Sequence, residues 1–281
     1  MDTQTLHIAG LPVHLFTAAD TPPDAPLTIL FFLHGRLGQY QDNLRHFQSI
    51  LTHHAHHKRQ CDSSLMLCSF DQRNHGHRHV SERANTTWQD TPGNPLHAQD
   101  MHAIQVGTAR DVVLLMDYLP AYLTTHTIKR YLCAGISLGG HATWLALQLD
   151  TRLIAGIPII GCPDYLSLMT SRARTLKDGT GGLTEALFPR ALREVVERLD
   201  PTIHGMREKR LLVLCGARDR LVPYEAGRRF IEALQVEQQH HGGSTEVVVE
   251  AGVGHRCSDA MIERLCAFVL AEMHVPQGVR L

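Results

Sequence analysis

Short apolar runs alternate along the chain with longer segments whose apolar residues recur at helical spacing. Several runs, such as 28–33 and 154–160, lack polar alternation, which is typical of strands that helices cover on both faces. Strands that alternate with helices predict a βαβ architecture and a mostly parallel sheet. We predict eight strands, of which the first two form an antiparallel hairpin: 6–8, 13–16, 28–33, 65–70, 130–134, 154–160, 211–215 and 245–250. Helices are predicted around 40–52, 100–120, 138–149, 224–235 and 258–273.

One connection is longer than a single helix requires. About fifty residues separate the strands 154–160 and 211–215, where one crossover helix would need far fewer. We interpret residues 1–281 as a single domain and approximately 162–205 as a small helical cap insertion; a long ordered excursion is the alternative. Its apolar residues either form a pocket for the substrate or bury the underside of the cap: Leu166, Leu168, Met169, Leu183, Leu187 and Phe188.

Composition and charge narrow the class of protein. A formal net charge of −1 provides no overall field that would attract nucleic acid or an anionic membrane, so neither partner is expected. No apolar stretch is long enough for a membrane span, and the N-terminus lacks a secretory signature. The 7 cysteines are odd in number and scattered through apolar segments, which favours free thiols. We therefore expect a soluble, cytoplasmic protein.

The segment Gly135-Ile-Ser137-Leu-Gly139 carries the clearest chemical signal. It has the spacing G-x-S-x-G and lies between an apolar run and a helical segment. A serine on such a sharp turn needs glycines two residues to either side, because side chains there would collide. The free N–H groups of the following helix would favour an oxyanion nearby. The alternative is a glycine-rich turn in which Ser137 only caps the helix.

This segment resembles the nucleophile elbow of the α/β-hydrolase superfamily of serine hydrolases. The resemblance implies an α/β-hydrolase fold, with an eight-stranded, mostly parallel sheet flanked by helices and a small helical cap. The matching segments span residues 28–255, which is most of the chain. They support the fold and the mechanism more than the substrate, because this fold serves many chemistries.

The oxyanion hole is expected at the end of the strand 28–33. The sequence His34-Gly35-Arg36-Leu37-Gly38 is similar to the family's HG-x-x-G segment. By this resemblance the backbone N–H groups of Arg36 and Leu138 would stabilise the oxyanion. His34 is interpreted mainly as a support for the loop, and His34 and Gly35 are also candidate substrate-binding residues.

The same resemblance indicates the acid and the base. Asp219 lies in a segment that matches the family's G-x-x-D-x-x-V-P loop, and His255 follows the Gly-Val-Gly approach to the family's histidine. The order Ser, Asp, His is the one that this fold uses. His255 would take the proton of Ser137, while Asp219 would orient the imidazole. Asp164, which follows the strand 154–160, is the alternative acid.

Two further segments suggest sites of other kinds. The loop 71–79 contains an H-x-H-x-H pattern, but it also resembles a D-x-R-x-H-G loop that has a structural role in the superfamily. It lacks carboxylate or cysteine partners at the usual ligand spacing, as does the histidine run 53–57, so we expect neither metal nor cofactor. Trp88, on the loop before the helix 100–120, is a candidate substrate-binding residue.

The expected activity is hydrolysis of a carboxylic ester or thioester of a small molecule through an acyl-enzyme. An amidase or aminopeptidase is the alternative, for which a carboxylate such as Glu185 would have to bind the substrate's amino group. A non-catalytic protein that binds a small ligand is a third possibility. The sequence leaves the oligomeric state open.

Overall fold

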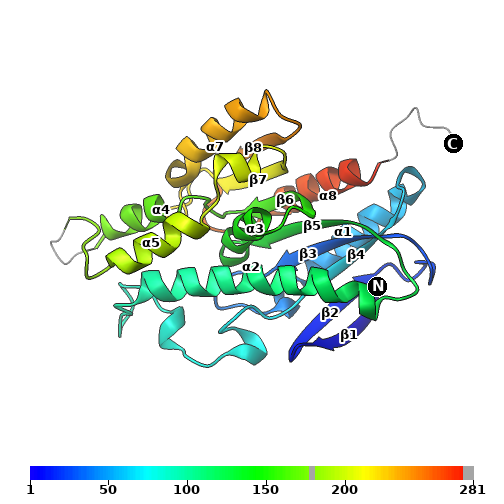
Figure 1. Ribbon diagram of the computed structural model, residues 1–281, viewed down its shortest axis with the longest axis horizontal. Helices are drawn as coiled ribbons and strands as arrows, with labels where there is room; N and C mark the ends of the chain where they lie inside the picture. The colour runs from blue at the N-terminus through cyan, green and yellow to red at the C-terminus, as the bar shows by residue number, and fades with distance from the viewer. Residues whose placement is uncertain (177–180, 275–281) are drawn as a thin grey trace.

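The computed structural model describes residues 1–176 and 181–274 (Figure 1). In these ranges eight strands form one sheet in the order β1-β2-β4-β3-β5-β6-β7-β8. The strands are β1 (Asp2–Ile8), β2 (Leu11–Thr17), β3 (Leu27–Leu33), β4 (Ser64–Ser69), β5 (Ile128–Ile136), β6 (Leu153–Ile159), β7 (Arg210–Gly216) and β8 (Ser244–Glu250). The first two pairings, β1 with β2 and β2 with β4, are antiparallel, and the other pairings are parallel.

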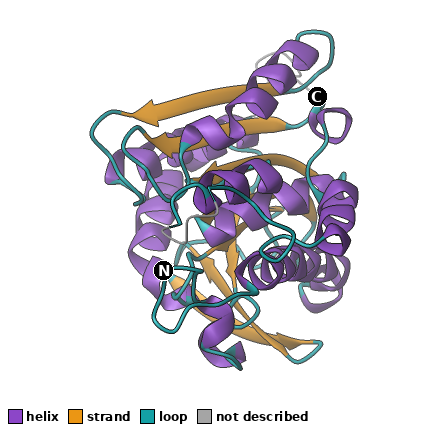
Figure 2. Ribbon diagram, turned by 90° about the vertical axis from the view of Figure 1, so that its left-hand side faces the viewer, coloured by secondary structure: helices purple, strands orange, loops and turns teal. Residues whose placement is uncertain are grey.

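The α-helices cover both faces of this sheet (Figure 2). They are α1 (Leu44–His57), α2 (His97–Tyr122), α3 (Leu138–Leu149), α4 (Tyr165–Ala173), α5 (Arg190–Leu199), α6 (Ile203–Met206), α7 (Tyr224–Gln238) and α8 (Asp259–Met273). Short 3-10 helices lie at Tyr40–Asn43, Lys58–Gln60, Gly76–Arg78 and Arg83–Asn85. No α-helix in the described ranges combines the length and the apolar character that crossing a bilayer requires.

Alternate residues of the central strands enter two separate cores. In β3, Phe31 and Leu33 pack with residues of α2, α3 and α7, while Leu30 and Phe32 pack with residues of α1 and α8. Because both faces of β3 are buried, its sequence has no polar alternation. The apolar run that predicted a strand thus also predicted its place inside the sheet.

The predicted fold class and all eight strands are confirmed, and the differences are in the bounds. The helix expected at 40–52 begins as a 3-10 turn and continues as α1 to His57, because His54 packs inward at the end of the predicted segment. The helix expected at 100–120 begins three residues earlier, at His97. This early start places His97 in the first turn, where it lies beside Trp88.

The long connection between β6 and β7 contains the short helices α4, α5 and α6. Leu168, Met169 and Phe188 are buried in a third apolar cluster that also includes Leu138 and Met101. These three residues therefore bury the inner side of the connection, which is one of the two uses considered for its apolar residues. The assignment of 162–205 as a cap domain stays a prediction, and within it residues 177–180 lie outside the described residues.

An ion pair links β5 to the segment before β4, across the intervening β3, at the end of the sheet opposite the strands' carboxyl ends. Both terminal nitrogens of Arg130, in β5, donate to the carboxylate of Asp62, just before β4, at 2.7 Å each. Asp62 and Arg130 are both largely buried. The hydrogen bonds from Arg130 lower the pKa of Asp62 to about 2.

We expect Asp62→Asn to lower the free energy of unfolding by about 1–2 kcal/mol near neutral pH. The pKa of the folded-state carboxyl is depressed, so this contribution is complete above the ordinary value of 3.8 and is lost as the pH falls towards about 2. Urea unfolding of both proteins between about pH 6 and pH 3 measures the difference. Asp24→Asn, at an exposed turn position, is the control. A difference that stayed constant over this pH range would contradict the prediction.

Candidate active site

Ser137 occupies a strained turn between the end of β5 and the start of α3. Its backbone angles are φ 54° and ψ −107°, in the region that residues with a side chain rarely adopt. The Ser137 N–H donates to the carbonyl of Ile159 at 2.8 Å, and the Gly139 N–H donates to the carbonyl of His34 at 3.1 Å. The turn is therefore held between the carboxyl ends of β3 and β6.

The flanking glycines are required by close backbone contacts. A Cβ on Gly135 would overlap the backbone of Gly139, and a Cβ on Gly139 would overlap the carbonyl group of Leu33. The glycine spacing in the sequence thus reflects the approach of β5, α3 and β3 at one point.

Ser137, His255 and Asp219 form a continuous hydrogen-bonded chain. The Ser137 Oγ lies 2.8 Å from the Nε2 of His255, and the His255 Nδ1 lies 2.7 Å from the Oδ2 of Asp219. The three residues come from the turns that follow β5, β8 and β7. Because these strands are parallel, their carboxyl ends meet at one edge of the sheet.

The surroundings of Asp219 keep its carboxylate ionised. The Oδ1 atom accepts hydrogen bonds from the N–H groups of Leu221 and Val222, both at 2.9 Å. Burial alone would raise the pKa, but the hydrogen bonds from His255 and Val222 outweigh it, and the pKa of Asp219 is lowered. The Asp219 side chain is 0% exposed and that of His255 is 23% exposed, so solvent reaches the imidazole but not the carboxylate.

The alternative acid, Asp164, has a different role in the structure. It is the N-cap of α4, and its Oδ1 accepts from the N–H of Ser167 at 2.8 Å. Of the two carboxylates considered, Asp219 is the one hydrogen-bonded to His255.

The loop predicted to form the oxyanion hole lies beside the nucleophile elbow. A Cβ on Gly35 would be 4.0 Å from the Cβ of Ser137 and 3.7 Å from the carbonyl oxygen of Ile136. Within the described residues, the backbone N–H groups of Arg36 and Leu138 donate to no protein acceptor. Two free donors next to Ser137 are what an oxyanion hole requires.

His34 supports this loop from inside the protein. It is 1% exposed, its Nδ1 donates to the carbonyl of Gly35 at 2.7 Å, and its Nε2 accepts from the N–H of Gln72 at 3.0 Å. Burial lowers the pKa of His34 to about 4, so the ring is neutral near pH 7. This geometry favours the supporting role over a direct contact with substrate.

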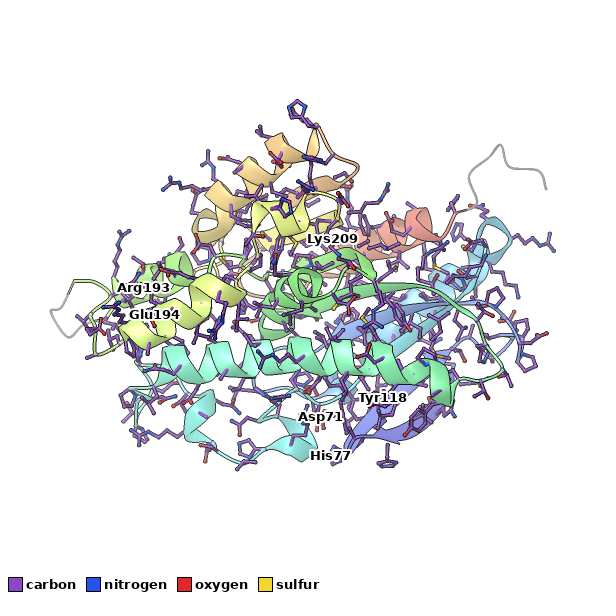
Figure 3. The ribbon with its side chains drawn as sticks, viewed as in Figure 1. Asp71, His77, Tyr118, Arg193, Glu194 and Lys209 are labelled. Carbon is purple, nitrogen blue, oxygen red and sulfur yellow. The ribbon has the colours of Figure 1, made fainter. Side chains whose placement is uncertain are left out.

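The loop 71–79 is held by its own side chains. Asp71 accepts from the Nδ1 and the N–H of His77 at 2.7 and 2.9 Å, and the two side chains lie together below α2 (Figure 3). Arg73 and Arg78 both donate to Asp111 of α2. The described residues contain no group of three histidine, cysteine or acidic side chains arranged to hold a metal ion.

Trp88 lies beside a pocket that sequence reasoning did not identify. Its ring packs edge to face on His97 with 5.2 Å between centroids. Arg172 of α4 and Arg220 of the acid loop line the same pocket. Arg172 belongs to no motif and Arg220 occupies a variable position of the acid-loop motif, so the sequence offered no signal for either.

The fold and this site define the class of protein as a serine hydrolase of the α/β-hydrolase fold. The model of the prolyl oligopeptidase family matches residues 92–271, well over half of the chain. The chain belongs to the prolyl oligopeptidase family.

A curated relative and several solved structures are similar to the chain. A Bacillus subtilis protein, "Putative esterase YitV", is 22% identical over 134 residues, which are 46% of this chain and 52% of that protein. The chain thus spans about half the length of the curated relative that it matches.

The solved structures share the fold. TT1662 from Thermus thermophilus has a TM-score of 0.69 at 21% identity, covering 98% of this chain and 100% of that one. Est1E from Butyrivibrio proteoclasticus, with ferulic acid bound, has a TM-score of 0.60 at 17% identity, covering 96% and 97%. An acylaminoacyl peptidase from Pyrococcus horikoshii has a TM-score of 0.62 at 12% identity, covering 100% of this chain and 43% of that one.

We expect Gly139→Ala to lower the free energy of unfolding by about 1–3 kcal/mol, because the new methyl group would overlap the end of β3. Gly242→Ala is the matched control, since a Cβ there would meet nothing within 4 Å. Urea denaturation of both variants and wild type measures the effect. Equal stability of the two variants would show that the elbow relaxes easily and would contradict the prediction.

Proposed function

We propose that the protein hydrolyses carboxylic esters or thioesters of small molecules, with Ser137 as the nucleophile, His255 as the base and Asp219 as the orienting acid. The observation that carries this proposal is the continuous hydrogen-bonded chain from Ser137 Oγ to Asp219 Oδ2. These three residues lie at the carboxyl edge of the sheet, where α/β proteins place their binding sites.

The proposed reaction has two steps. His255 Nε2 takes the hydroxyl proton as Ser137 Oγ attacks the ester carbonyl, and the N–H groups of Arg36 and Leu138 stabilise the oxyanion. The imidazolium then gives that proton to the departing alcohol or thiol, which leaves an acyl group on Ser137. Water, deprotonated by His255, attacks the acyl carbonyl; the bond to Ser137 Oγ then breaks as His255 returns the proton to that oxygen, and the acid is released. Throughout, Asp219 accepts a hydrogen bond from the Nδ1–H of His255, and its negative charge stabilises the imidazolium.

Peptide or amide hydrolysis is the second candidate, because the family to which the chain belongs is named for an oligopeptidase. The carboxylate considered for an amino-group site is not placed for that role. Glu185 is exposed, and its Oε1 accepts from the N–H of Arg190 at 2.6 Å, at the start of α5. The curated relative carries the name "Putative esterase YitV", which supports the ester as first choice.

A fluorophosphonate probe tests the nucleophile, with the adduct located by mass spectrometry. We expect labelling on Ser137 and turnover of short-chain 4-nitrophenyl esters. Ser137→Ala should abolish labelling and lower kcat by about 10⁴-fold or more. Thioesters and aminoacyl 4-nitroanilides are assayed in parallel. A clear preference for the anilides would favour the peptidase, while a folded wild-type protein that is neither labelled nor active would refute the serine-hydrolase proposal.

The two candidate acids are separated by a matched pair of variants. Asp219→Asn should lower kcat by about 10⁴-fold, because asparagine favours the wrong tautomer of the histidine. Asp164→Asn should leave kcat nearly unchanged, since asparagine caps a helix about as well as aspartate does. Circular dichroism of both variants checks the fold. A larger loss from Asp164→Asn would assign the acid to Asp164 instead.

A further inference from the structure

A cavity of about 270 Å³ lies beside the loop that carries Asp219. Three chain segments form its walls: the loop that leads to α2, the end of α4, and residues 220–221 that follow the acid. The side chains used below are Trp88, His97, Arg172, Arg220 and Leu221. At roughly 30 Å³ per water molecule in the liquid, this volume suits a small polar group and a short alkyl chain.

Among the described residues, the pocket is lined by basic side chains and not by acidic ones. Arg172 and Arg220 both line it, and none of the described residues around it is acidic. None of the ion pairs formed within residues 1–176 and 181–274 includes either arginine. Asp219 and Asp90 act on Arg172 and His97 through space, but among the described residues no carboxylate lines the pocket or pairs directly with its two arginines.

Neutral groups are the partners of Arg172. Its Nε and one terminal nitrogen donate to the carbonyl of Leu221, both at 3.3 Å, and the other terminal nitrogen donates to His97 Nε2 at 3.2 Å. The His97 Nδ1 lies 2.9 Å from the carbonyl of Thr86, which fixes Nε2 as the acceptor. Burial lowers the pKa of His97 to about 3, so this partner carries no charge near pH 7.

A buried guanidinium with neutral partners is costly unless an anion joins it. Burial lowers the pKa of Arg172, yet arginine remains charged at neutral pH. Each of its terminal nitrogens has two N–H groups, so donors remain after the bonds to Leu221 and His97 are made. Trp88 lines the same pocket, while its indole N–H is buried and has no acceptor within the described residues.

The pocket shares one lining residue, Leu221, with the surroundings of Asp219. The carbonyl of Leu221 accepts from Arg172, while the N–H of Leu221 donates to Asp219. Trp88 and Leu221 pack against the apolar cluster that contains Leu138, which follows the nucleophile. The pocket thus shares Leu221 with the hydrogen bonds that hold Asp219.

We propose that this pocket binds an oxyanionic group, a carboxylate or a phosphoryl group, at the end of the substrate opposite the scissile ester. The proposal rests on the proposed ester hydrolysis and adds a substrate class, namely acids that also carry an ester or thioester. Guanidinium groups match both kinds of oxyanion by paired N–H donors.

Binding is tested without catalysis, in Ser137→Ala protein, by tryptophan fluorescence. The chain has 2 tryptophans: Trp88 lines the pocket, and Trp144 is buried against Phe230. We expect methyl hydrogen glutarate to change the emission saturably and neutral methyl pentanoate, of equal chain length, to have no effect at the same concentration. Trp88→Phe should remove the response.

Competition at constant ionic strength identifies the oxyanion. Displacement of the hemi-ester by inorganic phosphate at lower concentration than by acetate would assign the pocket to a phosphoryl group, and the reverse order would assign it to a carboxylate. No saturable response to the hemi-ester and none to either anion would overturn the proposal.

Kinetics provide the second test. Wild type should have a higher kcat/KM for 4-nitrophenyl hydrogen glutarate than for 4-nitrophenyl pentanoate, and Arg220→Gln should reduce the ratio of the two values by about tenfold. Arg172→Gln should reduce it further, and Arg220→Lys should restore part of it. Arg228→Gln, whose arginine pairs with Glu225 and Glu232 on α7, is the control and should keep the wild-type ratio.

The two proposals fail in different ways. Hydrolysis of both esters with equal kcat/KM, and no change in the ratio on removing Arg220 or Arg172, would overturn the oxyanion pocket and leave the ester hydrolase standing. Hydrolysis of neither ester would contradict the proposed function, and the fluorescence titration would still decide whether the pocket binds an oxyanion.

Discussion

The close approach of three backbone segments at the elbow is the constraint on which the rest of the structure depends. Ser137 takes an unfavourable backbone conformation, which persists because its N–H bonds to the end of β6 and the next turn bonds to the end of β3. These contacts leave no room for a Cβ at Gly135 or Gly139. The same contacts place the Ser137 hydroxyl beside His255 and bring the loop of Gly35 alongside. The unfavourable backbone conformation of Ser137 is thus offset by hydrogen bonds to the ends of two neighbouring parallel strands.

Neutral buried histidines form a second layer of support around the site. Burial lowers the pKa of His34 to about 4 and those of His97 and His141 to about 3. Each uses a ring nitrogen as a hydrogen-bond acceptor: His34 for the N–H of Gln72, His97 for Arg172 and His141 for the N–H of Cys162. An unfolded chain would protonate them below about pH 6.5, so their burial makes the folded state less stable as the pH falls below that value. These three of the chain's 20 histidines therefore serve as uncharged structural hydrogen-bonding groups.

Charge is distributed unevenly around the proposed active centre. The negative charge of Asp219 is stabilised by two backbone N–H groups and His255, whereas the guanidinium of Arg172 on the other side of the same loop has only neutral partners in the described protein. The acid loop therefore lies between the carboxylate of Asp219, which has hydrogen-bond donors on both oxygens, and the guanidinium of Arg172, which has no ion-pair partner among the described residues. One fold can serve many chemistries, so the proposed selectivity for substrates rests on this difference in charge rather than on the triad.

The sequence by itself determined the strands and the elbow, because both depend on local patterns. Short apolar runs, several of them without polar alternation, predicted the eight strands, and the glycine spacing around Ser137 predicted the strand-to-helix turn. The loops of Asp219 and His255 were also recognisable by their motifs. Only the tertiary structure shows that Asp219 reaches His255 across the sheet edge while Asp164 caps α4, because these contacts join segments far apart in the chain. It alone also brought Trp88, Arg172 and Arg220 together in one pocket, since these residues come from segments far apart in the chain.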